Sequence, residues 1–239
     1  MSDPAGDRPA PRSAVPVVRW ALPDPSIVAA VLARIGLSGR SRREPAADDE
    51  RLVPLANAWL SLERAAGARS PWGRLVAVDR GGGRLRRPAP AHAAPGDGVR
   101  LVGIGWATVD VARSASELGA RRLDPRPPDE ALGAHAARAT DFVPDENPEE
   151  DRSWLVNGPE LVLLEPSTEG RIAASLARFG EGPAALYIAP SVVRAGALTG
   201  RPSAPTAGPF GRQHLVVGGP VEGPHLVLVD GNRPGTIGR

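Results

Sequence analysis

Apolar residues recur along this chain at two different spacings, and the two spacings alternate in order. Residues 17–22 form a short, mostly apolar run that begins with two valines, which is typical of a strand. Directly after this run, apolar residues at 27, 31, 32 and 35 fall on one side of a helix. The chain is therefore predicted to open with a strand that leads into an amphipathic helix.

This strand-and-helix pattern occurs twice. Residues 17–24 (VVRWALPD) and 103–110 (GIGWATVD) share the order Trp-Ala-x-x-Asp, and an alanine-rich amphipathic run follows each copy. Asp24 and Asp110 stand where a helix N-cap belongs, and a glycine stands where each helix should end. We therefore predict two homologous strand–helix units, with the tryptophan of each copy buried beneath its helix.

Further strands and helices are predicted along the rest of the chain. Short apolar runs indicate strands at 51–57, 58–64, 73–79, 152–157, 160–166, 183–189, 212–219 and 224–230. Helical spacing or an alanine-rich composition predicts helices at 129–139, 168–180 and 190–198. The acidic, proline-rich residues on either side of the first of these helices are expected in exposed loop. The predicted fold class is α/β (α+β), with mixed sheets.

The composition divides the chain into four parts. Residues 1–14 carry prolines and charges without an apolar pattern, so we expect a disordered tail. Residues 81–98 are rich in glycine, proline and arginine, which is typical of a linker. The linker would separate an N-terminal module at 15–80 from a larger part at 99–239, for which we expect two modules.

Residue types that are absent exclude several kinds of chemistry. The chain of 239 residues has no cysteine, and all 29 of its basic residues are arginine. A disulfide, a thiolate nucleophile, a cysteine-bound metal, a Schiff-base lysine and a P-loop lysine are therefore excluded. The net charge of only +2 gives no support for nucleic-acid binding. No apolar stretch suits a membrane-spanning helix and no signal-peptide pattern is present, so we expect a cytoplasmic protein without a membrane partner.

Several segments resemble the vicinal-oxygen-chelate (glyoxalase/bleomycin-resistance) superfamily, above all its methylmalonyl-CoA-epimerase-like branch. Residues 160–189 (ELVLLEPSTEGRIAASLARFGEGPAALYIA) are similar to that branch's order of IELLEP, a short helix, GEG and a strand. Residues 103–110 resemble its opening strand, and residues 51–64 (RLVPLANAWLSLER) resemble another glyoxalase-like stretch. The resemblance implies repeated βαβββ modules that form curved mixed sheets around a concave pocket.

The resemblance also implies a metal site, but this chain departs from the family at the ligand positions. The family's histidine and glutamate ligands fall on Gly103, Val162, the pair Ala184–Ala185, and Val229 or, with a shift of one residue, Asp230. At most one of these side chains can bind a divalent ion, whereas a catalytic ion normally needs three protein ligands. We therefore predict no metal and no other cofactor.

In this family the ligand positions face the concave side of the sheet, and strand alternation extends that face to neighbouring residues. The resemblance therefore predicts an apolar, metal-free pocket, with Arg19 as the lone charge on the wall of the N-terminal module. The alternative is that small residues let the sheet pack against another module and leave no cavity. The residues expected to contact a ligand are Arg19, Gly103, Gly105, Val162, Leu164, Ala185 and Tyr187.

A second candidate site lies in the predicted C-terminal hairpin, where His214, His225, Glu222 and Asp230 are close in sequence. Such residues can form a metal or acid–base cluster, although histidines at strand ends more often lie at the surface.

Three functions remain open from the sequence. The main prediction is a protein that binds an apolar or acyl small molecule in a metal-free pocket. The first alternative is an isomerase or lyase of the glyoxalase/epimerase type that acts on an acyl-CoA or a 2-oxo-acid. The second is an interaction protein whose degenerate modules form a homodimer.

Overall fold

The computed structural model describes residues 17–34, 37, 40–41, 51–55, 57–65, 73–79, 99–142, 159–167, 169–190, 203–216, 221 and 223–230. The tail expected at 1–14, the linker expected at 81–98, the strand expected at 152–157 and most of the helix expected at 190–198 lie outside these residues.

The first sheet is built from residues between 17 and 79 and has five strands in the order β2-β3-β4-β1-β5. β1 runs parallel to β4 and antiparallel to β5, so the sheet is mixed. The elements of this part are β1 (Val17–Leu22), α1 (Pro25–Arg34), β2 (Arg40–Ser41), β3 (Arg51–Pro54), β4 (Trp59–Arg64) and β5 (Arg74–Asp79).

The second sheet has eight strands in the order β11-β12-β13-β10-β6-β9-β8-β7. Among the described residues, no helix combines the length and the apolar character needed to cross a membrane. The elements of this part are β6 (Arg100–Ala107), α2 (Val111–Glu117), β7 (Ala120–Asp129), β8 (Ala134–Phe142), β9 (Glu160–Pro166), α4 (Arg171–Phe179), β10 (Gly182–Ala189), β11 (Thr206–Gly208), β12 (Gly211–Leu215) and β13 (His225–Val229).

One pairing pattern occurs three times in the two sheets. In each set of four consecutive strands, the first pairs in parallel with the fourth: β1 with β4, β6 with β9, and β10 with β13. Trp20 lies opposite Leu62 in the first pair, and Trp106 lies opposite Leu163 in the second. Trp20 is fully buried, whereas Trp106 is partly buried and packs against the same core.

The predicted helix caps are confirmed at α1 and α2. Asp110 Oδ1 accepts a hydrogen bond from the backbone N–H of Arg113 at 2.9 Å, and Asp24 Oδ1 accepts one from the N–H of Ser26 at 2.9 Å. Gly119, just beyond α2, has a φ of +78°, which glycine adopts without steric cost.

One helix prediction is wrong. Residues 129–139, for which the sequence predicts a helix, form the end of β7, a turn and the first part of β8. The loop expected before them is largely β7 itself. Asp129 Oδ1 accepts the N–H of Leu132 at 3.0 Å and Gly133 has a φ of +65°, both of which favour a turn. Because β8 pairs with strands on both sides, its ladder bonds outweigh the helix preference of its alanines.

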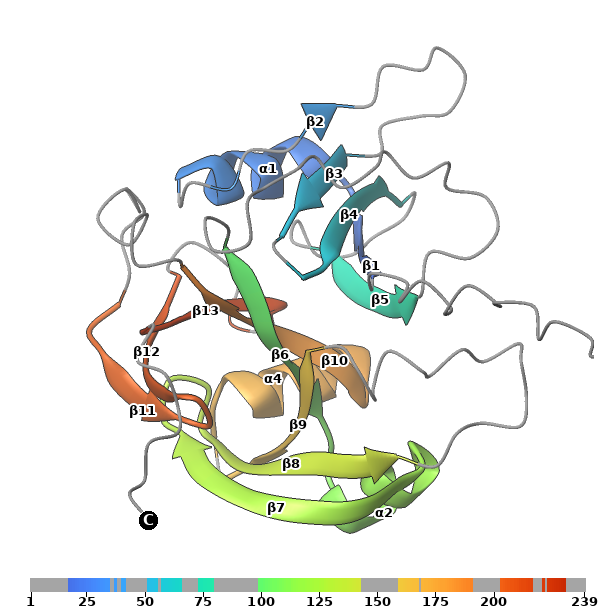
Figure 1. Cartoon of the computed structure of the whole chain (residues 1–239), viewed down its shortest axis with the longest axis vertical. Coiled ribbons are helices and arrows are strands. Elements are labelled where there is room, and N and C mark those ends of the chain that lie inside the picture. The colour runs from blue at the N-terminus through green and yellow to red at the C-terminus, as the bar shows by residue number, and fades with distance from the viewer. Residues whose placement is uncertain are drawn as a thin grey trace, which may run out of the picture.

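The second sheet curls, and its two faces carry different cores (Figure 1). On the convex face, Ile104, Leu163 and Leu186 join a cluster that includes Trp20 of the first sheet and residues of α1 and α2. On the concave face a second apolar cluster forms, and α4 lies inside the curl with Ile172 fully buried in that cluster. The predicted fold class, α+β with curved mixed sheets, is therefore confirmed.

The curl also brings the two edge strands of the second sheet together. Glu130, directly after β7, donates its backbone N–H to the carbonyl oxygen of Ala207 on β11 at 3.2 Å. In return, Glu130 Oε2 accepts the N–H of Ala207 at 3.0 Å. We call this contact between the end of β7 and β11 the seam.

Candidate functional site

Six of the seven residues predicted to contact a ligand lie together on the concave face of the second sheet. The register explains this, because Gly105 lies opposite both Val162 and Ala185, and Gly103 lies opposite Tyr187. Residues paired in this way point to the same side of a sheet. The six are Gly103, Gly105, Val162, Leu164, Ala185 and Tyr187, and the last four are each 0% exposed.

Side chains fill the space directly above these six residues. A Cβ atom added to Gly103 would collide with the ring of Phe210, and one added to Gly105 would lie 2.7 Å from Leu164 Cδ1. Phe210 also packs on Tyr187, with their ring centroids 4.9 Å apart, and Ile172 of α4 fills the neighbouring part of the curl. The two glycines therefore allow close packing, and the part of the concave face directly above these six residues is apolar and filled.

A buried polar cluster lies at one end of this face. Tyr187 donates its hydroxyl proton to Asp129 Oδ2 at 2.6 Å, and Gln213 Nε2 donates to Asp129 Oδ1 at 2.8 Å. Burial raises the pKa of Asp129, and its hydrogen bonds oppose that shift. Burial, followed by the charge of Asp129, raises the pKa of Tyr187 well above its usual value. The cluster joins the end of β7 to β10 and β12. Because the Tyr187 hydroxyl donates its proton to Asp129, it is not available to donate to a ligand.

Sequence reasoning missed Asp129 and Gln213. Both side chains are 0% exposed, and each lies on a segment that packs against segments distant along the chain. The only local signal was the Pro-Pro-Asp order before a glycine-containing turn, which indicates a strand end but does not reveal a partner.

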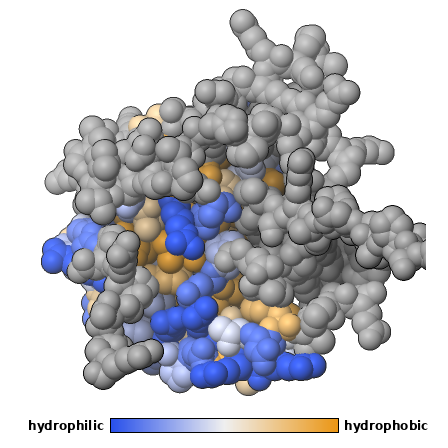
Figure 2. Space-filling view, in the orientation of Figure 1, coloured by the Kyte–Doolittle hydropathy of each residue, from blue (hydrophilic) through white to orange (hydrophobic). Residues whose placement is uncertain are grey.

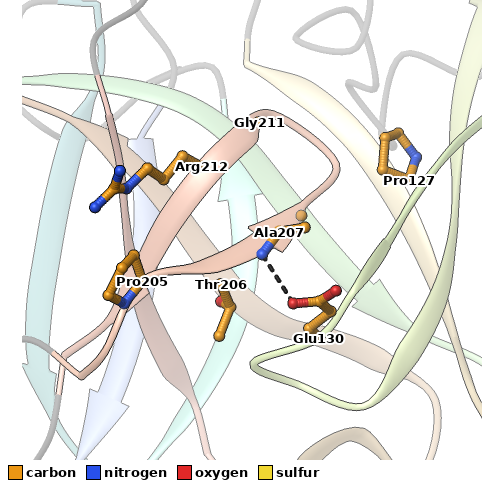
Figure 3. A pocket seen from close by; sticks show the side chains of 8 residues that line it. Pro127, Glu130, Pro205, Thr206, Ala207, Gly211 and Arg212 are labelled. Atoms are coloured by element: carbon orange, nitrogen blue, oxygen red, sulfur yellow. Dashed lines mark hydrogen bonds between the residues drawn. The ribbon is translucent and has the colours of Figure 1, made fainter.

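A pocket of about 570 Å³ opens at the seam, between the end of β7 and the β11–β12 hairpin (Figure 3). Such a volume suits a small organic molecule. Thr206 Oγ1 on its wall and Oε1 of Gln213, the residue paired with Thr206, are buried without a hydrogen-bond partner among the described residues. The lining residues are Pro127, Glu130, Pro205, Thr206, Ala207, Gly208, Gly211 and Arg212.

Arg19, the seventh predicted contact residue, lies on the first sheet, apart from the other six. Its Nε and one terminal nitrogen donate to the two carboxylate oxygens of Glu63 at 2.6 and 2.7 Å. Ser61 Oγ donates to the same carboxylate at 3.1 Å. The guanidinium is thus held by an acid of its own sheet.

The second candidate cluster is not assembled as a group. His214 Nε2 lies 3.4 Å from Asp230 Oδ1, and Arg212 Nε lies 3.2 Å from Asp230 Oδ2, so these three side chains share one face of β12 and the residue after β13. His225 instead points to the concave side, opposite Ala185, and is buried. Burial and the charge of Arg171 lower the pKa of His225 to about 4. Glu222 lies outside the described residues.

The residues at the family's metal positions do not fit a divalent ion. Gly103, Val162 and Ala185 lie on the concave face and have no donor atom in their side chains. Asp230, the one acid that a shifted alignment offers, pairs with Arg212 and His214 instead. Within the ranges that the structure describes, no three His, Cys, Asp or Glu residues come together in a way that could hold a metal ion.

Comparison of the sequence with family models finds no match, and no curated protein sequence matches either. Solved structures do match. A mutant of 4-hydroxymandelate synthase from Streptomyces coelicolor superposes with a TM-score of 0.52 at 13% identity, covering 95% of each chain. A hypothetical protein from Bacillus halodurans gives a TM-score of 0.40 at 15% identity, over 58% of this chain and 98% of its own. Methylmalonyl-CoA epimerase from Mycobacterium tuberculosis gives 0.39 at 18% identity, over 56% and 88%.

At these identities the likeness concerns the fold alone. The superposition that spans 95% of the chain agrees with the curled mixed sheets and with the parallel pairing of first and fourth strands described above. The chain therefore has the vicinal-oxygen-chelate fold.

Proposed function

We propose that this protein binds an apolar or acyl small molecule without a metal ion. The observation that carries the proposal is the chemistry of the concave face, where the positions that would hold the metal are Gly103, Val162 and Ala185. With no donor at these positions and with side chains filling the face above them, recognition of a ligand would rest on apolar contact and shape in another part of the fold.

The seam pocket is the place where such a ligand would bind. Its volume of about 570 Å³ lies within the range of small-molecule sites, and proline, alanine and glycine form much of its wall. Glu130 and Arg212 on the wall supply polar groups that a ligand could contact, whereas Thr206 Oγ1 and Gln213 Oε1 are buried. The pocket therefore combines apolar contact with a few polar groups.

The test is calorimetric titration of the full-length, tag-free protein in excess EDTA with octanoate, octanamide and octanoyl-CoA. We expect at least one of the three to bind. The variant Ala207→Phe should abolish that binding, because Ala207 lines the pocket and a phenyl group there would obstruct it.

The matched control is Ala112→Phe, which adds the same group to an exposed position of α2 and should leave binding unchanged. Binding of none of the three compounds, or equal binding by Ala207→Phe and the wild type, would contradict the proposal.

A metal-independent isomerase or lyase that acts on an acyl-CoA or a 2-oxo-acid is the second candidate. The Asp129–Tyr187 pair favours it, because groups with perturbed pKa values are frequent at functional sites. One measurement distinguishes the two candidate functions, namely the exchange of the α-proton of methylmalonyl-CoA for deuterium in D₂O. Exchange above the protein-free rate that Tyr187→Phe abolishes would favour the enzyme over the binding protein.

A further inference from the structure

Two arginines from adjacent strands share one carboxylate on the concave side of the second sheet. Arg126 lies opposite Ala136, Arg138 lies opposite Val162, and Glu160 precedes Val162 by two residues, so the three charged side chains point to one side. Arg126 Nη2 and Arg138 Nε each lie 3.2 Å from the same atom, Glu160 Oε2.

This arrangement leaves positive charge without a partner. Charge-assisted hydrogen bonds between a guanidinium and a carboxylate are usually about 2.7–2.9 Å long, so both contacts with Glu160 are loose. On this side of β7, β8 and β9 there are three arginines, Arg122, Arg126 and Arg138, and three acids, of which Asp129 is buried against Tyr187 and Gln213, leaving Asp124 and Glu160 to face the arginines. Arg122 pairs with Asp124 at 2.7 Å, and one positive charge remains in excess at the other pair.

A buried donor points to the same conclusion. Nε of Arg126 is buried and has no hydrogen-bond partner among the described residues. Leaving a charged donor desolvated and unpaired is unfavourable, so the guanidinium of Arg126 is poorly satisfied within the described part of the protein. The side chains of Arg126, Arg138 and Glu160 are 28%, 35% and 31% exposed, so a solute can reach them. Figure 2 shows hydrophilic residues gathered on this β7–β8 side of the molecule, with apolar residues at the surface beside them.

We propose that Arg126 and Arg138 form an anion subsite that binds the carboxylate of an amphipathic ligand. The inference rests on the proposed binding function and adds the chemical class of the ligand. Arg126 directly precedes Pro127, which lines the seam pocket, so the charged subsite and the apolar pocket share β7. A carboxylate would accept hydrogen bonds from the partly exposed guanidinium groups of Arg126 and Arg138 and would neutralise the positive charge that Glu160 alone does not balance.

The test compares octanoate with octanamide, which share the apolar chain and differ in charge. In titrations of the wild-type protein at pH 7.5 in EDTA, octanoate should bind about tenfold more tightly, the effect expected of one charge-assisted hydrogen bond. Arg126→Gln and Arg138→Gln should each remove most of this preference and leave octanamide binding unchanged. Arg121→Gln, which makes the same change of net charge at an exposed position on β7, should retain the preference.

A measurement on the wild type alone guards against variants that do not fold. Excess acetate should weaken the binding of octanoate and leave that of octanamide unchanged. Equal affinity of the two probes, or an equal loss in all three arginine variants, would overturn the subsite while leaving the proposed binding function in place. Failure of both probes and of octanoyl-CoA to bind would overturn both proposals.

Discussion

At the scale of single residues, two buried polar side chains, Asp129 and His225, have pKa values that the fold shifts from their usual values. Asp129 accepts hydrogen bonds from Tyr187, Gln213 and the backbone of Leu132, so its burial is compensated. His225 is also buried, and its Nε2 has no partner among the described residues. Neither residue is distinguished by its sequence neighbours, and both acquire their properties from segments that are distant along the chain.

His225 makes stability depend on pH in a defined window. Its folded-state pKa of about 4 lies below the ordinary value of 6.5, so the unfolded chain takes up the proton first as the pH falls. Stability is therefore complete above pH 6.5 and should fall by about 3.5 kcal/mol as the pH drops below 4, from a difference of about 2.5 pKa units at about 1.4 kcal/mol each. Urea unfolding at pH 7 and pH 4.5 should show about two thirds of this loss.

In His225→Gln, most of the loss of stability that the wild type shows between pH 7 and pH 4.5 should disappear. His135→Gln removes an exposed histidine of β8 and serves as the control, with the wild-type dependence expected. A His225→Gln protein with an unchanged pH dependence would show that His225 titrates normally in the folded state.

At the scale of elements, α4 decides the character of the concave face. The helix prediction at 168–180 is confirmed, since α4 spans Arg171–Phe179. Periodicity shows that such a helix has an apolar side, but not which surface that side will cover. In the structure this side enters the curl of the second sheet and joins the cluster around Leu164 and Ala185. The helix thereby converts a concave surface into a filled core.

Ile172→Ala should destabilise the protein by about 3 kcal/mol, because Ile172 is fully buried in this cluster and truncation leaves a cavity. Chemical denaturation measures the change. Ile27→Ala is the control, because Ile27 on α1 is 41% exposed and its truncation should cost well under half as much. Equal costs for the two variants would mean that α4 does not dock in the curl.

At the scale of the whole molecule, the two sheets share a single apolar cluster and a polar clamp. The side chain of Asn57, between β3 and β4, donates from Nδ2 to the carbonyl oxygen of Leu101 at 2.8 Å and accepts the N–H of Leu101 at 2.9 Å. This amide thus serves both backbone groups of a residue in the other sheet.

The homodimer, the cytoplasmic location and the absence of a nucleic-acid partner remain predictions.

Asn57→Ala should weaken the contact between the sheets by about 1–3 kcal/mol, since both backbone groups of Leu101 lose their partner. Hydrogen exchange measures the effect directly, and the amide of Leu101 should exchange faster in the variant. The amide of Ile172, which bonds to the carbonyl oxygen of Leu132 within the second part, is the internal control. Unchanged protection at Leu101 would show that the clamp is not formed in solution.

The sequence by itself determined most strands and two capped helices, and together with the family resemblance it indicated the side of the second sheet on which six of the seven predicted contact residues lie. These features depend on the spacing of apolar residues along the chain and on two local signals, the N-cap Asp110 and Gly119 after α2. All of these can be read directly from the sequence. Only the tertiary structure decided that residues 129–139 form a turn and a strand, because their partners are strands elsewhere in the chain. It also decided that α4 and Phe210 fill the concave face, that Tyr187 donates to Asp129, and that a pocket opens at the seam. Each of these depends on which surfaces meet when the sheet curls, and that geometry arises from all strands together.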